Sequence, residues 1–531
     1  MASTNSTLRV AIAPGKLIGR VDQASGVARF AGIPFAAPPV GALRWREPQP
    51  VVPWRGLRPA HNFRWRAMQL PVFGDMNFRS PGMSEDCLYL NLWTPAADPA
   101  ARLPVLIYFH GGGNIAGDGS EPRYDGAALA ARGIVVITAN YRLGIFGFLA
   151  HPELSRESPQ HVAGNYGYLD QVALLQWVHA HVAAFGGDPA RVTIAGESAG
   201  SVAVSALMAS PLSKDLIAGA IGSSGSLLGT LAPRTLAQAE AEGVAFGERM
   251  QAPTLAELRA LPARRLLRAT ANMSFAQFTA VTDGYFLPQS PLEIYRAGRQ
   301  ARVPLLAGWN SEELPFFVVL GNTPPSRASL AALFEHEYGE QAAEALRLYP
   351  ATSDNEALQS ATDYAGDRFT GYSTWKWCDL HAAHAPVFRY MYAHPRPPMR
   401  PELADAVAGL AGGIVRGAKA RKNAPPPPPP PRGAVHSADI EYAMGNLATN
   451  LVYDWTTADE QISQIFQAYY ANFVKTGDPN GPGIPSWPAA VHDAAGQIMW
   501  IDSNSRAVSD QHRERYLFLD SFATNSEGQH D

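Results

Sequence analysis

The stretch that decides the fold reads Arg191-Val192-Thr193-Ile194-Ala195-Gly196-Glu197-Ser198-Ala199-Gly200-Ser201-Val202-Ala203-Val204. Its β-branched first half predicts a buried strand, and its small and apolar second half has helical density. A strand, a tight Gly-x-Ser-x-Gly turn and a helix form the geometry of a nucleophile elbow. Gly196 and Gly200 lack a Cβ, so strand and helix can approach closely. Ser198 is therefore expected at a helix N-terminus, where backbone N–H groups favour developing negative charge.

The same pattern also fits a small-residue turn that carries an incidental serine, so the elbow needs partners elsewhere in the chain. The chain has 531 residues, of which 46% are hydrophobic and 17% charged, which is enough material for a large core. A net charge of −4 without a long basic run gives nucleic-acid binding no support. The cysteines, Cys87 and Cys378, make no disulfide scaffold.

The N-terminus is polar and has no apolar signal core, and no apolar run approaches the ~18 residues of a membrane span. These features predict a soluble, cytoplasmic protein, with secretion an alternative if a leader has been removed.

Continuous apolar runs mark strands that are covered on both faces. Such runs occupy residues 104–109, 134–138, 303–308 and 387–392, whereas 88–93 alternates and 169–184 has helical spacing. Strand, helix and strand in this order predict an α/β fold with a mostly parallel, twisted central sheet flanked by helices. Residues 32–41 predict a rigid, turn-rich segment.

Residues 396–432 are an unusual insertion. The segment is rich in Ala and Gly, contains Lys419, Arg421 and Lys422, and ends in seven prolines at 425–431. A proline run has no amide donors and favours an extended polyproline II rod. We interpret the segment as a mobile surface insertion with a stiff end. The alternative is a binding site for a proline-recognising partner.

An activated serine needs donors for the oxyanion, an acid and a base. His110-Gly111-Gly112-Gly113 follows a buried strand, and its unshielded amides predict an oxyanion loop. Gly112 and Gly113 would donate together with Ala199.

The acid should follow the serine, and Gly308-Trp309-Asn310-Ser311-Glu312-Glu313-Leu314 offers two adjacent carboxylates between which spacing cannot choose. Chain order and loop placement favour His436, within Gly433-Ala434-Val435-His436-Ser437-Ala438-Asp439, as the base. Metal chemistry has no support, because the chain has neither His-Glu-x-x-His nor a cysteine pair at zinc spacing. The glycines after His110 match neither a Rossmann nor a phosphate-loop spacing.

These motifs together resemble the type-B carboxylesterases, the cholinesterase-like branch of the α/β-hydrolase fold, and within it the bacterial p-nitrobenzyl-esterase kind. The matching segments run nearly end to end: Gly32-Ile33-Pro34, 84–91, 110–113, Asn140-Tyr141-Arg142, 164–167, 185–189, 196–200, 477–481 and Trp487-Pro488.

The resemblance implies that Glu313 is the acid and His436 the base. It also implies supporting roles beside the triad for Ser224 and Glu197. Structural ion pairs of the family fall on Arg44 with Glu85 and on Arg142 with Asp170.

Three departures from the family pattern matter. Ala67 stands where the family has the disulfide partner of Cys87, so we expect a free thiol, which suits a reducing compartment. The 70–83 loop lacks the tryptophan that holds a quaternary ammonium in cholinesterases and has only Phe73 and Phe78, which argues against choline esters. Leu314, followed by Pro315, stands in place of the usual glycine after the acid, so the local turn is expected to differ.

The resulting prediction is one α/β-hydrolase domain over residues 1–531, with a mostly helical inserted region at 227–385 that contains the acid loop 303–314 and walls the active-site gorge. The expected activity is serine-dependent hydrolysis of carboxylic esters with short to medium acyl chains. The expected protein needs no cofactor or metal, has a small-molecule ester as its partner, binds no nucleic acid or membrane, and is a monomer or weak homo-oligomer. Residues expected at the pocket are Asn114, Phe316, Phe317 and Phe78.

Two alternatives to ester hydrolysis remain at this point. The same triad also serves enzymes that act on amides, carbamates or polyesters, and acyltransferases. A non-catalytic, neuroligin-like binding protein is disfavoured, because such proteins lack triad residues and every position is filled here.

Overall fold

A computed structural model describes residues 6–95, 98–229, 232–274, 277–403, 405–415, 430–494 and 496–527. The main sheet has the strand order β1-β2-β3-β5-β7-β6-β8-β9-β12-β13-β16-β17, with β4 beside β2. Its strands are β1 (Ser6–Ile12), β2 (Gly15–Val21), β3 (Ala28–Pro34), β4 (Leu57–Pro59), β5 (Tyr89–Thr94), β6 (Leu103–Phe109), β7 (Val135–Ala139), β8 (Gly187–Glu197), β9 (Gly219–Ser223), β12 (Leu305–Asn310), β13 (Val387–Tyr392), β16 (Gln497–Ile501) and β17 (Arg506–Ser509).

The middle of the sheet, from β7 through β6, β8, β9, β12 and β13 to β16, is parallel. Both margins are antiparallel, except that β4 pairs with β2 in parallel. Parallel strands are buried on both faces, and the buried apolar side chains of β6, β7 and β8 fit this rule. The central strands predicted from apolar runs are therefore confirmed, to within two residues. The turn-rich prediction for residues 32–41 was wrong at its start, because β3 continues through Pro34.

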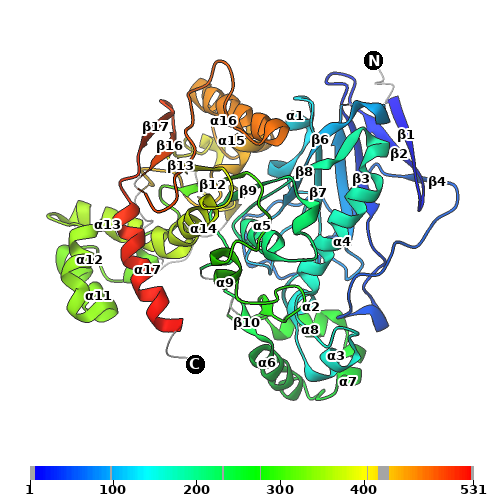
Figure 1. Cartoon of the computed structure of the whole chain (residues 1–531), viewed down its shortest axis with the longest axis horizontal. Helices are drawn as coiled ribbons and strands as arrows, with labels where there is room; N and C mark the ends of the chain where they lie inside the picture. The colour runs from blue at the N-terminus through cyan, green and yellow to red at the C-terminus, as the bar shows by residue number, and fades with distance from the viewer. Residues whose placement is uncertain are drawn as a thin grey trace.

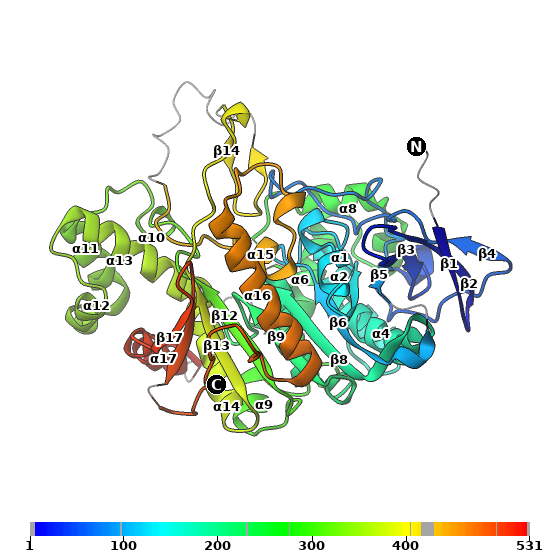
Figure 2. The same cartoon turned by 90° about the horizontal axis from the view of Figure 1, so that it is seen from above.

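Helices cover both faces of this sheet (Figure 1; Figure 2). Alternate residues of β6 point to opposite cores: Val105 and Ile107 pack in the cluster that contains α4 and α5, and Leu106 and Tyr108 in the cluster that contains α15 and α16. The helices are α1 (Ala127–Ala130), α2 (Gly144–Phe148), α3 (Pro152–Glu157), α4 (Tyr166–His181), α5 (Ala199–Ala209), α6 (Leu236–Arg249), α7 (Leu255–Ala260), α8 (Ala263–Ala269), α9 (Pro291–Arg296), α10 (Phe317–Leu320), α11 (Arg327–Tyr338), α12 (Ala342–Leu348), α13 (Asp354–Gly366), α14 (Tyr372–Ala382), α15 (Ile440–Met444), α16 (Thr457–Thr476) and α17 (Arg513–Glu527).

Region 227–385 contributes α6 to α14 to this fold, together with β12 and a short parallel pair, β10 (Arg234–Thr235) with β11 (Val281–Thr282). Helices α11, α12 and α13 lie with α17 at the end of the molecule opposite β1 and β2 (Figure 1; Figure 2). They enclose a separate aromatic cluster around Phe334, Tyr349 and Tyr364. No helix among the described residues is long and apolar enough to cross a membrane.

The first part of the insertion forms a small hairpin, β14 (Val407–Ala408) with β15 (Ile414–Val415). The predicted lysine and arginine cluster and the prolines at 425–429 lie outside the described residues. The predicted ion pairs are present. Arg44 binds both carboxylate oxygens of Glu85 at 2.6 Å, and Arg142 binds both oxygens of Asp170 at 2.8 Å. Cys87 is free and buried.

Candidate active site

The candidate nucleophile stands at the turn between β8 and α5. Ser198 has φ 56° and ψ −126°, in the positive-φ region that an L-residue adopts only when the surrounding structure holds it there. A Cβ on Gly196 would collide with the backbone of Gly200, and one on Gly200 with the carbonyl of Phe109. Both glycines are therefore required for the close packing that lifts Ser198 above the sheet, where it is partly exposed.

The oxyanion loop follows β6, the neighbour of β8. Gly111 packs directly on the elbow, since a Cβ there would lie 2.7 Å from the carbonyl oxygen of Glu197 and 3.1 Å from the Cβ of Ser198. Gly112 and Gly113 have φ values of 106° and 64°, which favour glycine. Because β6 and β8 are parallel, their carboxyl ends bring this loop and Ser198 to the same edge of the sheet.

The contacts of His110 indicate a structural role in this loop. Its imidazole stacks on Tyr141 with ring centroids 4.5 Å apart, and the Tyr141 hydroxyl donates to the His110 carbonyl at 2.6 Å. Burial lowers the pKa of His110 to about 4, so it is neutral at physiological pH.

The acid loop follows β12, and it pairs with the loop that carries the candidate base. The amide of Glu312 donates to the Ala434 carbonyl at 2.8 Å, and that of His436 to the Glu313 carbonyl at 3.3 Å. This pairing brings Nδ1 of His436 to 2.6 Å from Oε2 of Glu313. The other oxygen of Glu313 accepts from the Asn310 amide at 2.7 Å.

Glu312 and Glu313 are distinguished by what their carboxylates contact. Glu312 accepts from the amide of Arg432 at 3.1 Å and contacts Gln359, whereas Glu313 contacts the imidazole of His436. The contact between Glu313 and His436 forms with Leu314, followed by Pro315, at the position of the family's glycine.

A second carboxylate faces the other side of His436. Oε1 of Glu197 lies 3.2 Å from Nε2 of His436 and accepts from the Ser437 hydroxyl at 2.6 Å. Burial by itself lowers the pKa of His436, but the negative charges of Glu197 and Glu313 outweigh it and raise that pKa to about 9. Phe369, in the π-helical turn Asp367–Gly371 that follows α13, places its ring edge-on to the imidazole, with the ring centroids 5.1 Å apart.

Ser198 and His436 are not joined by a hydrogen bond here; within the described part of the chain the Ser198 hydroxyl makes none. Catalytic hydrogen bonds are often loose until substrate binds. The buried hydroxyl of Ser224, expected near the acid, has no hydrogen-bond partner among the described residues. Its backbone amide donates to the carbonyl of Gly308, within β12, at 2.8 Å.

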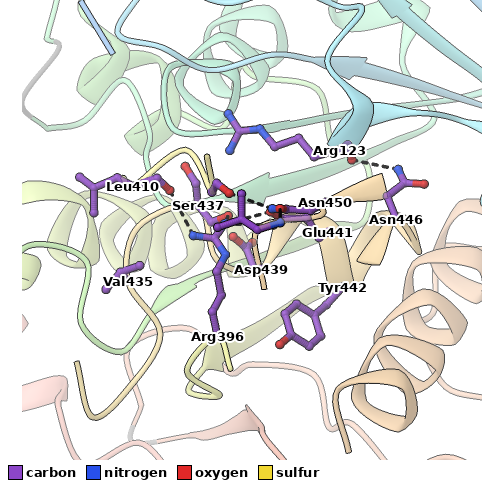
Figure 3. Close-up of polar contacts among 12 residues, drawn as sticks. Arg123, Arg396, Leu410, Val435, Ser437, Asp439, Glu441, Tyr442, Asn446 and Asn450 are labelled. Atoms are coloured by element: carbon purple, nitrogen blue, oxygen red, sulfur yellow. Dashed lines mark hydrogen bonds and ion pairs between the residues drawn. The ribbon is translucent and has the colours of Figure 1, made fainter. Parts of the chain in front are cut away.

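Polar groups behind His436 hold its loop in place. Asn310 donates to the Val435 carbonyl at 2.8 Å and to Asp439 at 3.3 Å, which ties the acid and base loops together. Arg396 donates to the Ser437 carbonyl at 2.8 Å and pairs with Glu441 at 3.0 Å (Figure 3). Burial, reinforced by the charges of Glu197 and Glu313, raises the pKa of Asp439 to about 7.

The residues predicted to line the pocket make the following contacts within the protein. Asn114 is buried and donates to the Tyr168 hydroxyl at 3.4 Å, and Phe78 lies under the guanidinium of Arg66 at 4.7 Å. Phe316 and Phe317 contact each other at the start of α10, and Phe317 is exposed. In the 70–83 loop it is Met76 that reaches the oxyanion loop, since its Cε lies 3.2 Å from where a Cβ on Gly112 would stand.

Sequence reasoning missed four groups in this neighbourhood: Met76, Asn310, Phe369 and Ser437. Asn310 and Ser437 lie inside the acid and base segments, so a search for polar side chains flanking those residues finds them. Phe369 and Met76 have no local signal, because their positions depend on how distant loops pack.

A family model described as "Carboxylesterase family" matches residues 6–519. The chain belongs to the carboxylesterase family. It is a carboxylic ester hydrolase with the α/β-hydrolase fold, which confirms the predicted family, fold and class of activity.

Curated relatives and a solved structure agree with this assignment. A fumonisin B1 esterase of Sphingopyxis macrogoltabida is 40% identical over 502 residues, covering 91% of this chain and 85% of the relative. A pyrethroid hydrolase of Mus musculus is 33% identical and covers 92% of this chain and 86% of its own length. The solved structure of a PNB esterase superposes with a TM-score of 0.78 at 29% identity, covering 96% of this esterase and 99% of that chain.

Proposed function

We propose that this esterase uses Ser198 as nucleophile, His436 as general base and Glu313 as the acid that orients it. The observation that carries the proposal is the 2.6 Å contact between His436 and Glu313 beside a serine held at a strained elbow. Ser198 and Glu313 follow β8 and β12, which lie on either side of β9 in the parallel part of the sheet, so both side chains come from its carboxyl edge, where the reacting groups of α/β enzymes gather. The loop of His436 pairs with the acid loop at this edge.

In the proposed reaction the neutral imidazole of His436 takes the proton of Ser198 as its oxygen attacks the ester carbonyl. Glu313 fixes the ring through Nδ1 and stabilises the imidazolium that forms. The amides of Gly112, Gly113 and Ala199 hold the tetrahedral oxyanion, and losing one such donor costs about 3 kcal/mol of barrier. His436 then protonates the leaving alcohol, and water resolves the acyl-enzyme with His436 again as base.

The substrate proposal is an ester with a short to medium acyl chain. No extended apolar lid stretch stands out in the sequence. The names of the relatives, a fumonisin B1 esterase and a pyrethroid hydrolase, add those two compounds to the substrates worth testing.

The test compares wild type with Ser198→Ala on p-nitrophenyl acetate, butyrate, octanoate and palmitate. We expect the variant to stay folded and to lose turnover by at least about a thousandfold, because the acyl-enzyme cannot form. Wild type should prefer acetate, butyrate or octanoate. Near-wild-type turnover by the variant refutes the nucleophile, and a preference for palmitate refutes the chain-length proposal.

A further inference from the structure

Ser437 follows the candidate base in the chain and connects the base loop to the end of β8. Its hydroxyl donates to Oε1 of Glu197 at 2.6 Å. The same oxygen lies 3.2 Å from Nε2 of His436. The serine hydroxyl and the imidazole therefore share one carboxylate oxygen, and the shorter of the two contacts belongs to the serine.

The backbone of Ser437 is in an uncommon conformation. Its φ of 65° lies in the left-handed region, which favours glycine. Among the described residues the serines with positive φ are Ser198, Ser224 and Ser437, and Ser224 follows directly on Ser223, whose carbonyl accepts from the Ser198 amide at 2.8 Å. Strained residues of this kind gather at active sites. Glycine would form the turn at 437 with less strain, so the side chain of Ser437 needs an explanation of its own.

Neighbouring groups fix the direction of the Ser437 hydroxyl. Arg396 donates to the Ser437 carbonyl at 2.8 Å and pairs with Glu441 at 3.0 Å (Figure 3). On the other side, the amide of His436 donates to the Glu313 carbonyl at 3.3 Å. Ser437 is also only 5% exposed. The backbone is thus held on both sides, and the buried hydroxyl is directed at Glu197.

The contact matters because of which imidazole nitrogen it concerns. Nδ1 of His436 is occupied by Glu313 at 2.6 Å, so Nε2 is the nitrogen that can take the proton of Ser198. A carboxylate beside Nε2 competes with Ser198 for that nitrogen and favours the imidazolium form, which cannot act as a base. An oxygen that already accepts a short hydrogen bond attracts a second donor less strongly, so the Ser437 hydroxyl weakens this competition.

Other charged groups also act on this pair. Burial lowers the pKa of His436, and the charges of Glu197, Glu313 and Asp439 raise it. Arg123, a buried guanidinium paired with Glu121, interacts electrostatically with Glu197. The hydroxyl of Ser437 is uncharged, so its removal leaves all of these charges in place. A change in the titration of His436 on its removal would therefore be transmitted through Glu197.

We propose that Ser437 is a positioning residue for the hydrolysis: its hydroxyl holds Oε1 of Glu197 away from Nε2 of His436 and leaves that nitrogen to Ser198. This inference rests on the proposed function, because it requires His436 to be the general base.

The test measures kcat/KM on p-nitrophenyl acetate from pH 5.5 to 10 for wild type, Ser437→Gly and Ser437→Ala. Both substitutions remove the hydroxyl, and glycine also suits the positive φ, which makes misfolding unexpected. We expect the rise of kcat/KM to move to higher pH by about half a unit or more in both variants. At about pH 8, below the rise, kcat/KM should therefore fall about threefold.

Two further variants separate this role from a structural one. In Glu197→Gln the neighbouring charge is absent, so adding Ser437→Gly should move the profile by less than about 0.2 unit. Ser213→Ala is the matched control: it removes a buried hydroxyl that donates to the Leu207 carbonyl, also at 2.6 Å, and should leave the profile unchanged.

The result that overturns the proposal is a profile of Ser437→Gly that is unchanged or moves to lower pH. An equal upward shift with and without Glu197→Gln also overturns it, because the effect would then not pass through Glu197. Failure of the proposed function has a different signature, since Ser198→Ala would then keep its turnover whatever the Ser437 variants do.

Discussion

Oε1 of Glu197 lies 3.2 Å from Nε2 of His436, so the residue directly before the candidate nucleophile contacts the candidate base. Glu313 binds the opposite nitrogen of the same ring at 2.6 Å. Two carboxylates on one buried imidazole favour its charged form, and the pKa of His436 rises to about 9 although burial opposes it. The base is then mostly protonated at neutral pH, and the two glutamates set the pH range in which it can act.

This arrangement predicts the effect of Glu197→Gln on the pH profile. A general base acts in its neutral form, so wild-type kcat/KM should rise with pH up to about 9. Removing the Glu197 charge lowers the pKa of His436, so the rising limb should move to lower pH by about one unit or more. The measurement is kcat/KM on p-nitrophenyl acetate from pH 5.5 to 10.

Glu312→Gln is the matched control for that experiment. Its carboxylate contacts Gln359 and the amide of Arg432 rather than the imidazole. The rising part of the pH profile of kcat/KM should lie at the same pH in Glu312→Gln as in wild type. If the pH at which kcat/KM rises is unchanged in Glu197→Gln, or shifts equally in both variants, the role given to the Glu197–His436 contact is contradicted.

Gly111→Ala tests the packing of the oxyanion loop on the elbow. The new Cβ would stand 2.7 Å from the Glu197 carbonyl oxygen and 3.1 Å from the Cβ of Ser198, so loop and nucleophile must separate. Small displacements of positioned groups cost about a hundredfold in rate. We expect kcat to fall by that factor with a near-normal melting temperature. Unchanged kcat in a folded variant would show that the loop need not contact the elbow.

The Arg142–Asp170 pair should matter for stability. Both side chains are buried, and removing one partner leaves an uncompensated buried charge. Arg142→Met should therefore lower the free energy of unfolding by about 3–5 kcal/mol. Arg347→Met removes an exposed pair with Glu344, where no measurable loss of stability is expected, because solvent screens such a pair. Equal losses in the two variants, measured by denaturant unfolding, would contradict this assignment.

Local patterns predicted the elbow, the central strands and the oxyanion loop, because each depends on residues that are adjacent in the chain. The choice between Glu312 and Glu313 needed the family resemblance, since their spacing from the strand is almost the same and only the paired loops separate them. The contact of Glu197 with His436 joins residues far apart in sequence, and no periodicity encodes it. Phe78 was expected at the pocket from its loop alone, and this stays a prediction; its ring packs under Arg66, and Met76 of the same loop reaches Gly112.

The hairpin within 396–415 illustrates the same limit. Its Ala- and Gly-rich sequence predicted a mobile segment, which stays a prediction, and in the described part Gly409 and Gly413 let the turn pack on Asp75. Glycine there serves a close approach to another loop, which composition alone does not reveal.

The most direct test of the proposed mechanism is covalent labelling by a fluorophosphonate, followed by peptide mass mapping. The account predicts one adduct per chain, on Ser198, formed fast in wild type and at least about a hundredfold more slowly in His436→Gln, because the base that activates the serine is missing. Labelling at any other residue, or equally fast labelling of Ser198 without His436, would contradict it.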